Sequence, residues 1–146
     1  MSSPLNVIVP CRGWLRPLID RSVSDLVDLA MAFAADPDAC LQKAYRQLED
    51  HLRTRTGLKE FGGKLFSRAF QANGAVLTWD VPDPAEAQGR ANLFAAVFMA
   101  YRNPRAHRLS MGDHLSEFLL LNQLFKLEAE AVGVAEPSIR TVSPND

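Results

Sequence analysis

The sequence predicts an all-α protein, a helical bundle of four to five helices with a short irregular or extended insertion. Three observations predict this fold class. The length of 146 residues is that of one domain. Apolar residues recur at helical spacing in most segments of the chain. Only one short stretch alternates as a strand does, and a lone strand cannot form a sheet.

Capping residues place the helices in the first half of the chain. A first helix is expected over residues 20–34. Asp36 and Pro37 predict the start of a second helix, which should end at Gly57. A shorter helix is expected over residues 61–70. Residues 75–81 alternate in polarity, and we expect them to be extended and to pack as a loop or a small hairpin.

The second half should contain two further helices. Asp83, Pro84 and Glu86 form a helix start with a capping box. This helix should end near Asn103, because Pro104 lacks an N–H and disfavours helical geometry in the residue before it. After a loop over 105–112, a last helix over about 113–132 is apolar on more than one face, as expected of a central or subunit-shared helix. The domain would span 20–133, with a segment of unknown role over 1–19 and a disordered tail over 134–146.

Composition excludes several classes of protein. Two cysteines, Cys11 and Cys40, are too few for a disulfide framework or a zinc site, and we expect idle thiols. No apolar run is long enough to span a membrane, and the N-terminus does not resemble a signal peptide, so we expect a cytoplasmic protein. A net charge of -1 argues against an obviously basic nucleic-acid binder.

The charge is unevenly distributed along the chain. Residues 41–70 carry a net charge of +4 and residues 101–110 a net charge of +3, whereas the remainder is acidic. Two interpretations have equal weight: a surface for a polyanion, or the mixed charges found on any solvated helix face.

One short segment, residues 102–107, combines residue types suited to phosphodiester chemistry. Arg102 can clamp a phosphate, His107 can exchange protons near neutral pH, and Asn103 can hold a polar group of the ligand. A helix break at Pro104 would let Arg102 and His107 converge, whereas on a continuous helix they lie about 140° apart. The alternative is that both side chains simply satisfy the last carbonyls of a helix.

This segment is Arg102-Asn103-Pro104-Arg105-Ala106-His107, and with the blocks over 48–57, 63–70 and 88–94 it resembles the Ymh-type (abortive-infection-like) family of the HEPN superfamily. The resemblance covers residues 36–131. The superfamily signature is Arg-Asn, three residues of any kind, then His. The resemblance implies a HEPN-like helical bundle and a metal-independent endoribonuclease without a cofactor, acting in toxin–antitoxin, abortive-infection or phage defence. Arg102 and His107 would be catalytic and Asn103 would support them.

The resemblance also implies partners. A homodimer would bring the Arg and His residues of two subunits into a composite active site, and an antitoxin or defence-system protein is a further expected partner. A polar residue of the second helix often assists, and Glu49, Arg53 and Arg46 are open alternatives. We expect the RNA to be bound by basic residues: Arg105, Arg108, Arg53, Arg46 and Lys43. The alternative functions are a non-catalytic HEPN domain that binds RNA, a nucleotide or a protein, and a purely structural dimer.

Overall fold

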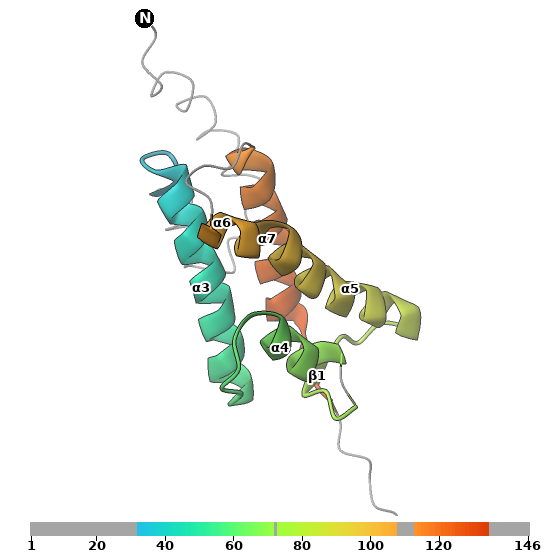
Figure 1. The fold of residues 1–146 in the computed structure, drawn as a ribbon. Coiled ribbons are helices and arrows are strands. Elements are labelled where there is room, and N and C mark those ends of the chain that lie inside the picture. The colour runs from blue at the N-terminus through green and yellow to red at the C-terminus, as the bar shows by residue number, and fades with distance from the viewer. Residues whose placement is uncertain (1–31, 72, 108–112, 135–146) are drawn as a thin grey trace, which may run out of the picture.

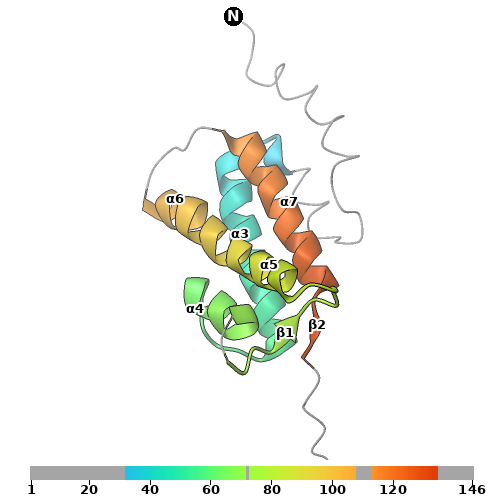
Figure 2. The same cartoon turned by 90° about the vertical axis from the view of Figure 1, so that its right-hand side faces the viewer.

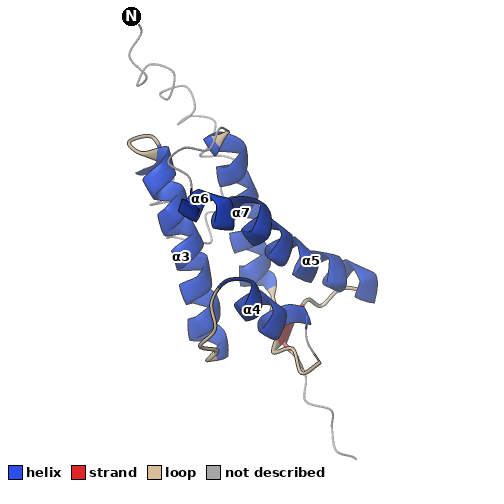
Figure 3. Cartoon of the chain, in the orientation of Figure 1, coloured by secondary structure: helices blue, strands red, loops and turns tan. Residues whose placement is uncertain are grey.

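The computed structural model describes residues 32–71, 73–107 and 113–134. This part confirms the predicted all-α bundle, because helices dominate and only two short strands accompany them (Figure 3). The expected helix over 20–34 lies outside the described residues except at its end, where residues 32–33 are helical. The segment over 1–19 and the tail over 135–146 also lie outside the described residues.

Helix α3, Pro37–Thr56, has both of the predicted ends. The Asp36 side chain accepts a hydrogen bond from the Ala39 N–H at 3.1 Å and so caps the helix start. Gly57 ends the helix with a left-handed φ of 73°, and its N–H donates to the Arg53 carbonyl. One face of α3 is buried, through Cys40, Leu41, Ala44, Tyr45, Leu48, Glu49 and Leu52.

The predicted short helix and the extended segment follow in order. Helix α4, Gly62–Phe66, continues into the π-helical turn η1, Ser67–Gln71. Strand β1, Leu77–Thr78, pairs antiparallel with β2, Val132–Gly133. The extended conformation is therefore confirmed, but the partner strand lies directly after the last helix rather than in a hairpin.

The helix predicted from Asp83 begins as expected but does not end near Asn103. Helix α5, Pro84–Val97, leads into the π-helical turn η2, Phe98–Arg102, and then into α6, Asn103–His107. Asn103 keeps helical angles, φ -65° and ψ -49°, and donates its N–H to the Phe98 carbonyl five residues back. This wider turn places Pro104 in the first turn of α6, where its missing N–H is tolerated. The predicted helix break and the loop from Arg105 are therefore wrong.

Helix α7, His114–Glu130, packs alongside α3, and α5, η2 and α6 run obliquely across this pair (Figures 1 and 2). Its predicted broad apolar character is confirmed by the buried residues Phe118, Leu121, Leu124, Phe125 and Leu127. Aromatic rings fill the space between the helices, with the Phe66 and Phe98 centroids 4.3 Å apart. Trp79 anchors β1 to α7 by donating from Nε1 to the Leu127 carbonyl at 2.8 Å.

Candidate functional site

Arg102 lies at the end of η2 and faces a buried carboxylate on α3. Its side chain is 35% exposed, and Nη2 lies 3.7 Å from Oε2 of Glu49, whose side chain is only 4% exposed. The other Glu49 oxygen, Oε1, accepts a hydrogen bond from the Gly62 N–H at 2.6 Å. One carboxylate thus faces both the guanidinium and the start of α4. Of the three open alternatives on the second helix, the structure brings Glu49 to Arg102.

Asn103 and His107 are both exposed on α6. Because the helix continues through Pro104, the turn that was expected to fold His107 back toward Arg102 does not exist. Within the described part of the chain, no hydrogen bond or ion pair joins Arg102 to His107. Helical periodicity places the two residues about 140° apart around the axis. One copy of the chain therefore presents the two signature residues on different sides of a helix.

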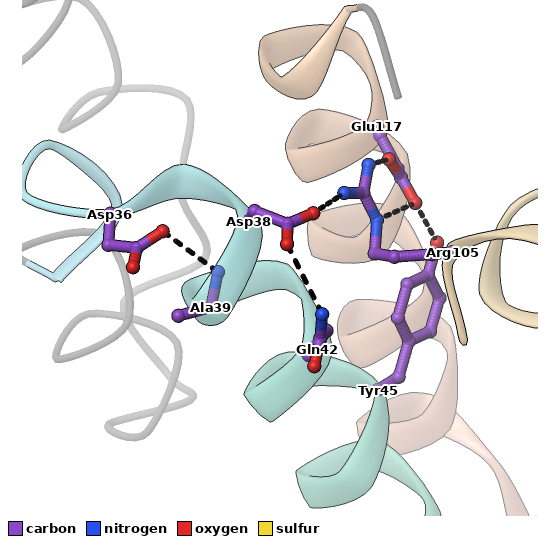
Figure 4. A network of polar contacts seen from close by, with 7 residues as sticks. All are labelled: Asp36, Asp38, Ala39, Gln42, Tyr45, Arg105 and Glu117. Carbon is purple, nitrogen blue, oxygen red and sulfur yellow. Dashed lines mark hydrogen bonds and ion pairs between the residues drawn. The ribbon is translucent and has the colours of Figure 1, made fainter. Parts of the chain in front are cut away.

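Arg105, which we expected to bind RNA, is not on the surface. Its side chain is 2% exposed and lies between α6, α7 and α3 (Figure 4). It donates from Nε to Glu117 Oε1 at 3.1 Å, from Nη2 to Glu117 Oε2, and from Nη1 to Asp38. A guanidinium so enclosed needs carboxylate partners, and it has two. Burial alone would lower the pKa of Arg105, but its hydrogen bonds to Glu117 and Asp38 raise it.

The buried network around Arg105 extends to α3. The Tyr45 hydroxyl donates to Glu117 Oε1 at 2.6 Å, and Gln42 donates to Asp38 at 3.2 Å. Burial, followed by the hydrogen bond to Glu117, raises the pKa of Tyr45 well above its usual range. Sequence reasoning missed this network. The available signal was Glu117 itself, a charged residue in helical register with the apolar stripe of α7.

The remaining residues expected to bind RNA differ in their surroundings. Lys43 and Arg46 are exposed on α3, and neither makes an ion pair with another described residue. Arg53 lies with its guanidinium carbon 4.2 Å from the centre of the Phe61 ring. Arg108 lies outside the described residues. Glu128 on α7 offsets one charge of the basic excess over 41–70 by pairing with Arg55, whereas the Arg68–Glu60 pair lies within that segment.

The sequence comparison identifies a family for most of the chain. A family described as "Protein of unknown function (Hypoth_ymh)" matches residues 30–130. The chain belongs to this family. The match includes Glu49, Gly62, Arg102 and His107 together with the Arg105 network, while the family description assigns no activity. Neither the curated proteins nor the solved structures give a match.

The described residues include one cysteine. Cys40 is buried, and burial raises the pKa of its thiol to about 12, as expected of an idle thiol; Cys11 lies outside the described residues. No cluster of three or more His, Cys, Asp or Glu side chains suited to a metal occurs in residues 32–71, 73–107 and 113–134. Over the same residues, none of the helices has the length and apolar character that crossing a membrane requires.

Proposed function

We propose that the chain is a HEPN-type endoribonuclease that acts without a metal or cofactor in toxin–antitoxin, abortive-infection or phage defence. The observation that carries the proposal is the contact between Glu49 on α3 and Arg102, the first residue of the Arg-Asn-x-x-x-His signature. A half-exposed guanidinium is held by a buried carboxylate, and an exposed histidine lies on the same continuous helix. Held in this way, Arg102 offers a solvent-facing, pre-positioned cation for a phosphate.

The proposed reaction is an internal transesterification of RNA. His107 removes the proton of a ribose 2′-hydroxyl, and the 2′-oxygen bonds to the adjacent phosphorus. The bond to the 5′-oxygen breaks, and a second histidine protonates that oxygen as it leaves. Arg102 stabilises the charge that develops on the phosphate oxygens. The products are a 2′,3′-cyclic phosphate and a 5′-hydroxyl, and DNA is not a substrate because it lacks the attacking hydroxyl.

A homodimer completes the site in this proposal. The continuous helix holds Arg102 and His107 of one copy on different sides, which supports a site completed by the Arg102 and His107 of a second copy. Glu49 is a positioning residue, because it acts on the phosphate only through Arg102. The proposal also places the chain in the cytoplasm, with an antitoxin or defence-system protein as a further partner.

The test is cleavage of end-labelled single-stranded RNA in EDTA. We expect Arg102→Ala and His107→Ala each to lower the rate by about 100-fold or more, as for the loss of an electrostatic stabiliser and of a general acid–base respectively. Arg90→Ala and His114→Ala are matched controls, because these residues lie on α5 and α7 outside the signature, and they should cleave as wild type does. The cleaved ends should be a cyclic phosphate and a 5′-hydroxyl.

Two results would contradict the proposal. One is equal cleavage by wild type and His107→Ala, and the other is cleavage that stops when EDTA removes metal ions. RNA that is bound but never cut would instead favour the non-catalytic alternative. Induced expression separates the same alternatives in cells, because a nuclease toxin should slow growth and Arg102→Ala should relieve that effect.

A further inference from the structure

Phe61 is the most exposed aromatic ring among the described Phe, Tyr and Trp side chains, with 60% of its surface accessible. Burying a Phe side chain stabilises a folded protein by about 1.5–3 kcal/mol. The exposed Phe61 side chain contributes little of this stabilisation. Its neighbours Lys59, Gly63 and Lys64 are exposed as well, and Glu60 is half-buried. The ring therefore projects from a polar segment rather than from a continuous apolar patch.

One face of the Phe61 ring is covered by Arg53. The guanidinium carbon lies 4.2 Å from the ring centroid, in the geometry of a cation–π contact. Nη1 of Arg53 lies 3.5 Å from Asp50, and its Nε is enclosed without a hydrogen-bond partner among the described residues. The guanidinium is thus held mainly by the ring and by Asp50. The face opposite Arg53 is therefore the one on which a base could stack.

The residue after Phe61 connects this segment to the candidate site. Phe61 directly precedes Gly62, whose φ of 58° is a left-handed value that other residues rarely adopt. The Gly62 N–H donates to Glu49 Oε1, and the second oxygen of Glu49 faces Arg102. A single buried carboxylate therefore links the backbone beside Phe61 to the guanidinium of Arg102.

We propose that Phe61, backed by Arg53, is a stacking platform for a base of single-stranded RNA whose phosphate lies at Arg102; this rests on the proposed function. Every base has a π-face, so an aromatic ring beside a cationic phosphate site binds single strands with little sequence preference. A protein interface would instead place Phe61 in an apolar core depleted of charge. The charged residues around Phe61 favour a nucleic-acid strand.

The test is the affinity for a fluorescent oligoadenylate RNA, measured with the full chain in a His107→Ala background to prevent cleavage. Phe61→Ala should raise the dissociation constant roughly five- to 150-fold, the range for loss of one stacked base. Phe61→Trp should stay near wild type, and Phe61→Leu should lose affinity as Phe61→Ala does. The slope of affinity against salt should not change, because no phosphate contact is removed.

A set of RNAs, each lacking one base, tests the stacking itself. When Phe61 is present, removal of the base at one position of the RNA should raise the dissociation constant by the same factor as Phe61→Ala does for the intact RNA. At that position Phe61→Ala should show no further loss, because the ring and the base act as one pair. Arg53→Lys keeps the charge without the planar stacking group and should weaken binding through the same position.

Four outcomes would overturn the inference or distinguish its failure from that of the proposed nuclease site. Unchanged affinity in Phe61→Ala would overturn it. Loss of affinity that follows dissociation of a dimer, as seen by sedimentation, would assign Phe61 to an interface between copies and also overturn it. If Arg102→Ala abolishes cleavage while Phe61→Ala changes neither affinity nor rate, only the platform is wrong. If stacking holds but Arg102→Ala still cleaves RNA, the proposed nuclease site is wrong.

Discussion

Arg102 and Arg105 lie three residues apart on one continuous helix and belong to the same six-residue signature, yet their surroundings are opposite. Arg102 is 35% exposed and has one carboxylate at 3.7 Å. Arg105 is 2% exposed and is enclosed by Glu117 and Asp38. The difference teaches that basic residues in a signature are not equivalent. Arg102 is partly accessible to solvent, whereas Arg105 holds α6 against α3 and α7.

The largest expected effect is on folding, from Arg105→Met. Removing the guanidinium leaves Glu117 charged and buried, and among the described residues only the Tyr45 hydroxyl then donates to it. Breaking a buried ion pair in this way costs about 3–5 kcal/mol. Urea unfolding should show this loss in the free energy of unfolding.

Arg102→Met is the matched control, and its loss should be smaller than that of Arg105→Met, because Arg102 is partly exposed and the buried Glu49 keeps the Gly62 N–H as a donor. The double variant Arg105→Met with Glu117→Leu should recover much of the stability, since no charge is then left buried. Equal losses for the two arginines would contradict the contrast between them.

A smaller effect is expected from Glu49→Ala, which removes the acceptor of the Gly62 N–H and the partner of Arg102. We expect a loss of about 1–3 kcal/mol in the free energy of unfolding, from the partly buried donor left unsatisfied. Glu49→Gln retains an oxygen for Gly62 but not the charge opposite Arg102. It should recover stability while RNA cleavage stays reduced, and a variant that recovers both would show that Glu49 has no positioning role.

The smallest effect concerns the start of α7. Asp113 accepts hydrogen bonds from the Ser116 hydroxyl at 2.6 Å and the Ser116 N–H at 2.9 Å. These bonds, the side-chain bond first, lower the pKa of Asp113 below its usual 3.8. A carboxyl whose pKa is lower in the folded state stabilises the protein above its unfolded pKa, and this contribution is lost as the pH falls through the folded value.

Asp113→Asn should therefore lower Tm slightly at pH 7, and the difference from wild type should shrink as the pH falls below about 4. Thermal melts at the two ends of this range measure it. A difference that grows in acid would contradict the sign.

Local features of the chain were predictable because their chemistry lies within a few residues. Asp36, Gly57 and Asp83 each act on backbone groups one turn away, and they set helix ends as expected. Pro104 does not end the helix as predicted, because the π-helical turn η2 before it places Pro104 in the first turn of α6. Residue preferences along the chain do not predict such a turn. The predicted capping box forms only in part: Asp83 accepts the Ala85 N–H, whereas the Glu86 side chain pairs with Arg90.

The sequence by itself determined the helical class, most helix ends and the family to which the chain belongs. Only the tertiary structure decided that Arg105 is buried, that Glu49 faces Arg102, and that the extended segment pairs with residues after α7. Helix periodicity and capping are short-range, so they can be read along the chain. Burial and ion pairing join residues as far apart as Asp38 and Arg105, whose contact exists only once three helices have packed together.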